Sequence, residues 1–176
     1  APSRIDVRYA FSAQTLEQIN SMALQMVDQT GMNLLVIDYL QLVRSSKSFL
    51  SDYERVTYVS QELKALALRL NIPVVALAQL SRALQGRADK RPVLSDFRDS
   101  GAIEQDADNV LMLHRFDSDG DQGLMDCDAG LVDGLAQKGG QLIQVRVLRQ
   151  RQGETFDTNV AFFPAKTRKA AIDRRI

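Results

Sequence analysis

The sequence predicts an α/β fold in which helices flank a mostly parallel sheet, with a β-hairpin near the C-terminal end. Two apolar runs, "LLVI" at 34–37 and "VVALA" at 74–78, have the continuous hydrophobicity of parallel strands that are covered on both faces. An amphipathic stretch lies between the two runs. When short loops join two strands through such a helix, a right-handed crossover onto a parallel sheet is the expected result.

The first part of the chain is expected to form a strand and then a helix. Residues 4–11 alternate between polar and apolar side chains, as a half-buried strand does. Thr15 and Gln18 have the spacing of a capping box at a helix start, with Ser12 as a rival cap. Gly31 is the expected stop of this helix, and residues 33–38 form the next strand.

The clearest helix of the chain is predicted between the two apolar runs. Ser51 and Glu54 have the spacing of a second capping box at its start. Asn71 ends it, and Pro73 opens the strand that follows. Its apolar positions recur at intervals of three and four residues, and they are Val56, Val59, Leu63, Leu66 and Leu70.

The middle of the chain is predicted to be loop, short helix and strand. Residues 79–101 contain Gly, Pro and many charges, and we expect mostly loop there. A short helix is expected at 103–107, with Ser100 as its cap. Residues 109–114, "NVLMLH", are the predicted fourth strand.

The C-terminal part is predicted to contain an insertion and a hairpin. Residues 115–140 are rich in Asp and Gly, and we expect an acidic flexible insertion. Alternating strands at 141–149 and 156–163 surround the turn sequence "QRQGET". The expected organisation is therefore one domain over residues 1–164 and a basic tail over 165–176.

Composition excludes several classes of protein. The 22 acidic and 22 basic residues cancel, so binding to nucleic acid has to come from a local patch of charge. Cys127 is the only cysteine, which excludes an internal disulfide and a cysteine-based metal cluster. The sequence contains no apolar run long enough for a membrane span and no signal-peptide pattern, so we expect a cytoplasmic protein without a membrane partner.

Two polar residues follow the two apolar strands directly. Asp38 follows "LLVI", and Gln79 follows "VVALA". In an open α/β sheet, ligands bind at the carboxyl ends of the strands. We therefore expect the two side chains to share a site, with Asp38 as a candidate ligand of Mg²⁺. The alternative is that Asp38 caps a turn or pairs with a nearby arginine.

The phosphate-binding loop that usually accompanies such an aspartate is not in the sequence. The motif G-x-x-x-x-G-K-[ST] does not occur at any position. Without it the chain has neither a cradle of backbone N–H groups nor a lysine for the terminal phosphates. We expect these 176 residues alone to bind a nucleoside triphosphate poorly and to hydrolyse it hardly at all.

Two basic segments are candidates for binding phosphates. The loop at 81–108 contains five cations and a single aromatic residue, so it could follow a nucleic-acid backbone without base stacking. Its cations are Arg82, Arg87, Lys90, Arg91 and Arg98. Arg149 and Arg151 lie two residues apart near the hairpin tip, where they could reach a neighbouring subunit's nucleotide. In both segments, the alternative is a set of solvated charges.

The acidic insertion resembles a calcium-binding loop only in part. Four of its aspartates occupy positions 1, 3, 5 and 12 of such a loop, and they are Asp117, Asp119, Asp121 and Asp128. Gln122 stands where that loop requires glycine, and no flanking helices are predicted. Calcium binding is therefore not favoured, and we interpret His114 and Cys127 as structural residues.

Four stretches of the sequence, taken in order, resemble one family. They are "NLLVIDYLQLV", "VVALAQLSRAL", "RADKRPVLSDFRDSGAIEQDADNV" and "RQRQG". Their order and spacing are similar to those of the RecA-like C-terminal ATPase domain of DnaB-type replicative DNA helicases. The resemblance runs from about residue 5 to about residue 163 and leaves residues 115–140 uncovered. It implies a RecA-like P-loop NTPase core.

The resemblance also implies roles for individual residues. Asp38 matches the Walker B aspartate, which helps to hold the Mg²⁺ of MgATP, and Gln79 matches the residue that senses the γ-phosphate. Arg151 matches the arginine finger that reaches the adjacent subunit's ATP, and Arg149 matches its partner, where the family usually has lysine. The implied DNA contacts, together with the cations that precede them in the loop, are Lys90, Arg91, Arg98, Asp99, Ser100 and Gly101.

At the level of the whole protein, the resemblance implies a hexameric, ATP-dependent helicase that moves on single-stranded DNA in bacterial, phage or plasmid replication. It makes a primase and a helicase loader candidate partners. It places the family's phosphate loop, catalytic glutamate and N-terminal collar before the start of this chain. Two alternatives stay open: a related RecA-like recombinase or clock-type ATPase, and a non-catalytic module that binds single-stranded DNA or assembles a ring.

Overall fold

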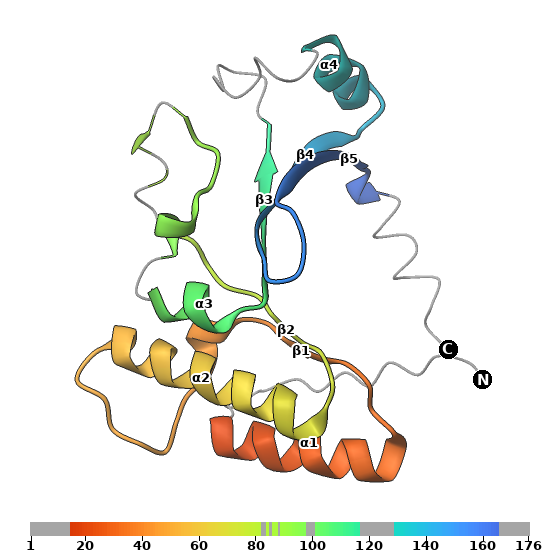
Figure 1. Cartoon of the computed structure of the whole chain (residues 1–176). Helices are drawn as coiled ribbons and strands as arrows, with labels where there is room; N and C mark the ends of the chain where they lie inside the picture. Colours follow the sequence, from red (N-terminus) through yellow and green to blue (C-terminus); the bar gives the residue numbers. More distant parts are fainter. Residues whose placement is uncertain are drawn as a thin grey trace. The chain divides into compact units, whose positions relative to one another are not determined.

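The computed structural model describes residues 15–81, 84, 86–87, 89–97, 101–116 and 129–165. Helices and strands mix along the chain, which confirms the α/β class (Figure 1). The chain divides into two compact units, one made of Ala1–Gln79 and Phe97–Asp106, the other of Leu80–Asp96 and Ala107–Ile176. The strand predicted at 4–11 lies outside the described residues, and so does Ser12, the rival helix cap. The division into a domain at 1–164 and a tail stays a prediction.

The first unit begins with helix α1 (Leu16–Thr30), whose ends follow local signals in the sequence. The Thr15 hydroxyl accepts a hydrogen bond from the N–H of Gln18 at 3.3 Å, and the Gln18 side chain accepts one from the N–H of Thr15 at 2.9 Å. Gly31 ends the helix at φ = +65°, a conformation that glycine adopts without steric cost. The predicted capping box and stop are confirmed.

Helix α2 (Asp52–Leu70) starts and ends where the sequence predicts. Ser51 caps it by accepting a hydrogen bond from the N–H of Glu54 at 3.2 Å. The prediction that Glu54 completes the capping box by accepting from the N–H of Ser51 is wrong. The Glu54 carboxylate accepts from the N–H of Leu50 instead, at 2.9 Å. Asn71 closes the helix in the left-handed conformation, at φ = +52°.

Strands β1 (Leu35–Ile37) and β2 (Val74–Ala76) pair in parallel, as predicted. Between β1 and α2 lies a short 3₁₀ helix, η1 (Leu40–Leu42). The expectation that both faces of this pair are covered is wrong. Only one face packs against the helices, and apolar side chains near or within the strands stay about half exposed on the other face: Leu34, Val36, Val75 and Leu77.

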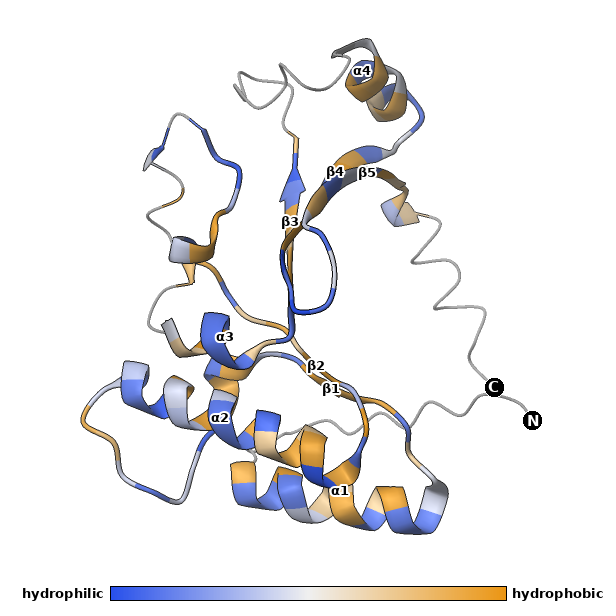
Figure 2. Cartoon of the chain, in the orientation of Figure 1, coloured by the Kyte–Doolittle hydropathy of each residue, from blue (hydrophilic) through white to orange (hydrophobic). Residues whose placement is uncertain are grey.

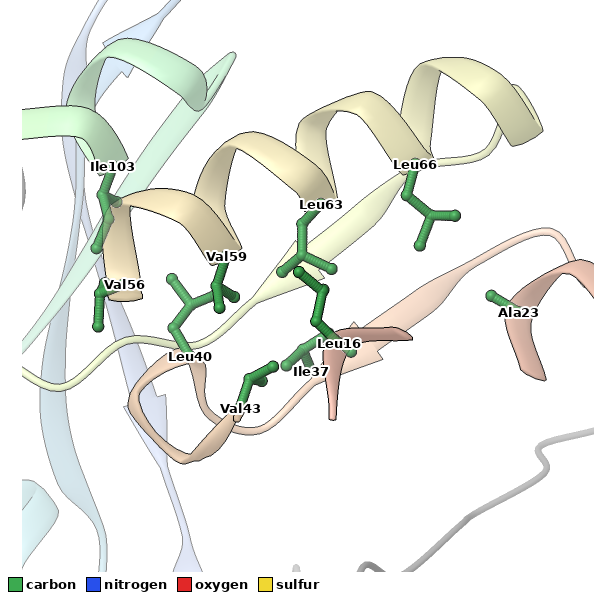
Figure 3. Close-up of a cluster of buried hydrophobic side chains, with 10 residues drawn as sticks. All are labelled: Leu16, Ala23, Ile37, Leu40, Val43, Val56, Val59, Leu63, Leu66 and Ile103. Atoms are coloured by element: carbon green, nitrogen blue, oxygen red, sulfur yellow. The ribbon is translucent and has the colours of Figure 1, made fainter. Parts of the chain in front are cut away.

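The core of the first unit lies between its two long helices and the parallel pair. Both helices have hydrophobic positions repeated along them, separated by hydrophilic ones (Figure 2). Figure 3 shows the buried side chains that form this core: Leu16, Ala23, Ile37, Leu40, Val43, Val56, Val59, Leu63, Leu66 and Ile103. Ile103 belongs to the short helix α3 (Gly101–Asp106), which begins two residues before the predicted start at residue 103. Its predicted cap, Ser100, lies outside the described residues.

The second unit is built on an antiparallel sheet with the order β3–β4–β5. Its strands are β3 (Asn109–Arg115), β4 (Gln141–Gln150) and β5 (Phe156–Phe162), and η3 (Leu94–Asp96) precedes them. The predicted hairpin is confirmed, with Val147 opposite Phe156. The prediction of a mostly parallel sheet is corrected for the described strands, because only β1 and β2 pair in parallel.

The segment predicted as a flexible insertion contains regular structure. Helix α4 (Ala129–Gln137) lies within it, and Val132 on this helix packs with Phe116 and Leu142 in a small core. Sequence inspection missed α4 because its glycines lower helix propensity, whereas tertiary packing stabilises the helix. Residues 117–128 lie outside the described part of the chain.

The loop that follows η1 is fixed to α1 by a carboxylate. Glu17 accepts hydrogen bonds from the Ser45 hydroxyl at 3.1 Å and from the N–H of Ser46 at 3.2 Å. Its own backbone N–H is the largest cause of a lowered pKa, and the Thr15 and Ser46 contacts add to it against partial desolvation. These bonds hold the pKa of Glu17 at about 2, well below its ordinary value of 4.5.

Replacing Leu66 by alanine should lower the free energy of unfolding by about 2–5 kcal/mol, because the side chain is fully buried and leaves a cavity. Chemical denaturation measures this loss. Leu68→Ala is the matched control, since Leu68 lies on the same helix and is 71% exposed. Its effect should stay within about 0.5 kcal/mol. Equal losses for both variants would contradict the described packing of α2.

Glu17 should make stability depend on pH in acid. Its folded pKa is depressed, so its contribution is fully present above pH 4.5 and is lost as the pH falls from 4.5 toward about 2. A carbon-13 NMR titration of the Glu17 carboxyl tests this directly, and Ser45→Ala should shift the midpoint upward. Glu17→Gln should flatten the stability curve in that pH window. A midpoint near 4.5 in the unmodified chain would refute the anchoring contacts.

Candidate functional site

Asp38 and Gln79 lie at the carboxyl edge of the parallel pair, as the sequence predicts. Pairing continues beyond the strands, because the N–H of Leu77 donates to Ile37 O at 2.9 Å and the N–H of Leu40 donates to Leu77 O at 2.8 Å. The chain therefore keeps the two segments adjacent up to the candidate residues. The peptide bond between Asp38 and Tyr39 is cis.

The side chain of Asp38 is exposed at this edge. Within the described residues, no hydrogen bond or ion pair engages its carboxylate, so the alternative of a turn cap or an arginine partner has no support there. The Gln79 side chain is exposed as well, and its carboxamide group makes no hydrogen bond in the same part of the structure. Both polar groups are thus available to a ligand at the strand ends.

Gln41 connects these two segments and was not singled out from the sequence. Its side-chain nitrogen Nε2 donates to the backbone oxygen of Gln79 at 3.2 Å, and its Oε1 accepts from the backbone N–H of Gln79 at 3.2 Å. We call this two-bond contact the Gln41 clasp. The signal that could have found it is the single amide in the otherwise apolar run "LQLV" that follows Asp38 and Tyr39.

The loop that leads away from Gln79 is held by a buried carboxylate. Asp96 is only 6% exposed, and its Oδ2 accepts from Arg87 Nη2 at 2.8 Å and from the N–H of Val93 at 2.8 Å. The same Nη2 donates to the backbone oxygen of Arg91 at 2.9 Å, and the N–H of Ser81 donates to Asp96 O at 2.8 Å. Arg87 therefore stabilises this loop through its hydrogen bonds to Asp96 and Arg91, and it is not a solvated cation.

Two other candidate cations of this loop, Lys90 and Arg91, differ in their surroundings. Arg91 donates to both carboxylate oxygens of Asp89, at 3.1 Å and 3.0 Å. The hydrogen bonds from the Arg91 side chain, and then from its backbone N–H, lower the pKa of Asp89. Lys90 is exposed, and no partner engages it in the described parts of the chain. Arg82, Arg98, Asp99 and Ser100 lie outside the described residues, and Gly101 is the first residue of α3.

Arg151 lies one residue beyond the end of β4, in the turn of the hairpin. Its Nη1 donates to the Asp108 carboxylate at 3.0 Å, and its backbone N–H donates to Asp108 O at 2.9 Å. Both side chains are largely exposed, at 69% and 48%, so this ion pair contributes little stability. Arg149 lies within β4 opposite Val110 and is partly buried.

A third arginine of this sheet has a structural role. Arg146 Nε donates to Asp157 Oδ2 at 3.0 Å across the hairpin, and its Nη1 donates to the backbone oxygen of Pro92 at 3.0 Å. Its side chain is mostly buried. Arg146 thus ties the loop that contains Lys90 to the sheet that presents Arg149 and Arg151.

The remaining predicted features add no site to the described residues. The calcium-register aspartates and Cys127 lie outside them. Within the described ranges, no three His, Cys, Asp or Glu side chains gather as a metal site requires. His114 is buried and meets Phe116 edge-on at 5.0 Å, as a structural residue does. None of the described helices is long and apolar enough to cross a membrane.

Residues 4–170 match the family described as DnaB-like helicase C terminal domain. The chain is 41% identical over 147 residues to the "Probable plasmid replicative DNA helicase" of Chlamydia psittaci, covering 84% of this chain and 29% of that protein. It is 34% identical over 161 residues to the "Replicative DNA helicase DnaB" of Geobacillus stearothermophilus, covering 91% of this chain and 32% of that protein. The chain thus spans less than a third of the length of these curated relatives.

Two solved structures are similar as well. One is described as the structure of a DnaB-like replicative helicase and its interactions with primase, with 32% identity and a TM-score of 0.66 over 83% of this chain and 32% of that chain. The other is described as an ATPase domain, with 33% identity and a TM-score of 0.67 over 85% of this chain and 48% of that chain. The similarity to an ATPase domain agrees with the predicted RecA-like core.

Proposed function

Since this chain belongs to the DnaB-like helicase C-terminal domain family, we propose that it is part of an ATP-dependent replicative helicase. The parent protein forms a hexameric ring, moves on single-stranded DNA and unwinds the duplex. The observation that best supports a nucleotide site is the pair of unengaged polar side chains, Asp38 and Gln79, at the carboxyl edge of two parallel strands. No feature of the described residues favours the recombinase or the non-catalytic module.

The chemistry of this edge fits the phosphate end of MgATP. Asp38 supplies a carboxylate, the type of oxygen ligand that Mg²⁺ takes beside phosphates, and helps to hold the ion. Gln79 supplies both a donor and an acceptor, and it contacts the γ-phosphate. Bound Mg²⁺ supplies neutralisation of phosphate charge. These 176 residues contain no G-x-x-x-x-G-K-[ST], so they form only part of the site and alone neither bind ATP tightly nor hydrolyse it.

Arg151 acts on the nucleotide of the adjacent subunit. Its guanidinium lies in an exposed hairpin turn and is held by a solvent-exposed ion pair that costs little to break. Arginine at such a position stabilises the charge that develops on the transferred phosphoryl group. Arg149 assists from within β4, and its forked guanidinium can bind two phosphate oxygens.

Single-stranded DNA binds through its backbone to the loop residues of this chain. Lys90 is the cation that the described part of the loop leaves exposed and unengaged, whereas Arg91 has to exchange Asp89 for a phosphate. The further contacts are proposed for Arg98, Asp99, Ser100 and Gly101. One of the similar structures is described with a primase, which supports a primase as a partner, and a helicase loader is proposed from the family.

Arg151→Ala in the whole polypeptide should lower the DNA-stimulated rate of ATP hydrolysis by about 10³-fold, because the charge on the reacting phosphate loses its finger. Arg69→Ala, an exposed arginine near the end of α2, is the matched control and should leave the rate unchanged. Analytical ultracentrifugation confirms that each variant forms the ring. Survival of the rate within about threefold in an intact ring would refute the finger assignment.

A further inference from the structure

The Gln41 clasp joins one side chain to both backbone polar groups of Gln79, its N–H and its C=O. We propose that Gln41 is the positioning residue of Gln79: it holds the Gln79 backbone so that the Gln79 side chain meets the γ-phosphate. This inference rests on the proposed function and extends it to a residue that contacts neither nucleotide nor DNA. Its substrate class is the nucleoside triphosphate of the same site.

The need for such a residue follows from where the strands stop. The ladder between β1 and β2 ends at Ile37 and Ala76, and the last backbone contacts across the two segments involve Leu77. Gln79 lies two residues further on, where no backbone group of the first segment pairs with it within the described residues. Without the clasp, its N–H and C=O would face solvent and its backbone would be free to rotate.

The carboxamide of Gln41 replaces the missing strand. A primary amide has a donor and an acceptor in one plane, so it can pair with the C=O and the N–H of a single residue, as a neighbouring strand does. Because both polar groups of Gln79 are held, both of its backbone dihedral angles are restrained. The Gln79 side chain then starts from a fixed position, as a contact that has to form at the γ-phosphate requires.

Gln41 is itself held from both sides. It lies in the 3₁₀ turn η1, where the N–H of Leu42 donates to Tyr39 O at 3.0 Å and the N–H of Val43 donates to Leu40 O at 3.1 Å. The flanking Leu40 and Val43 side chains are buried in the core of the first unit. The clasp therefore connects Gln79 to packed structure, and the same turn follows directly after Asp38 and Tyr39.

The first test measures the clasp in the 176-residue chain without nucleotide. Gln41→Met keeps the length and the flexibility of the side chain and removes both hydrogen bonds. Hydrogen exchange followed by NMR should show the Gln79 amide exchanging at least about tenfold faster in this variant. The amides of Leu77 and Leu40, which donate to backbone oxygens, should stay within about twofold and report an intact sheet edge. Gln61→Met, an exposed position on α2, is the matched control.

The second test measures the function in the ring formed by the whole polypeptide. Gln79→Ala sets the size of the effect, and Gln41→Met should lower DNA-stimulated kcat by at least about fivefold with the KM for ATP within about twofold. In a Gln79→Ala background, Gln41→Met should add nothing, because a positioning residue acts only through the residue that it positions. If Gln41→Met instead acted by damaging the fold, it would lower kcat by the same factor with Gln79 intact and in the Gln79→Ala background.

The outcomes separate the two claims. If Gln79→Ala leaves kcat unchanged, the proposed role of Gln79 is refuted, and the positioning role falls with it. If Gln79→Ala lowers kcat but Gln41→Met does not, the proposed function stands and the positioning role is overturned. If the exchange rate of the Gln79 backbone amide is unchanged in Gln41→Met, the clasp itself is overturned, whatever the ATPase activity of the ring.

Discussion

The parallel pairing of β1 and β2 determines where the candidate residues of the first unit can lie. Ile37 faces the core and Val36 faces away from it, so a shift of one residue in the register would exchange a buried side chain for an exposed one. The register therefore fixes the end of the strand, and with it the exposed position of Asp38. Helix α2 stabilises this arrangement, because its apolar face packs on the same side of the pair. Capping and core packing thus act on the site indirectly, by keeping two strand ends adjacent.

In the second unit, ion pairs separate structural cations from available ones. Arg87 binds the buried carboxylate of Asp96, and Arg146 binds Asp157 of the sheet. Each of the two arginines fixes the path of a loop. Arg151 has a partner too, but that pair lies in solvent, where an ion pair contributes at most about 1 kcal/mol. A charge that is oriented and yet easily released suits the proposed contact of Arg151 with the nucleotide of an adjacent subunit.

Local signals in the sequence predicted more of the fold than long-range ones did. Thr15 and Gly31 mark the ends of α1 correctly, because capping depends on hydrogen bonds within a few residues. The antiparallel pairing of β3, the exposed face of the parallel pair and helix α4 escaped prediction, because each depends on packing between distant segments. The same holds for the site: Asp38 and Gln79 follow from strand ends, whereas the contact between Gln41 and Gln79 joins residues 38 positions apart.

We propose that one nucleotide site is shared by two subunits, with Asp38 on one side and Arg151 on the other. Mixing rings of the whole polypeptide tests it most directly, using Asp38→Asn and Arg151→Ala subunits that are each inactive alone. In a head-to-tail ring, random mixing in equal amounts places an intact Asp38 beside an intact Arg151 at about one quarter of the interfaces. If the site is shared in this way, ATP hydrolysis should recover to about that fraction of the rate of the unmodified ring. Mixed rings that form and stay inactive would contradict it, because they would show that both residues serve the same subunit's site.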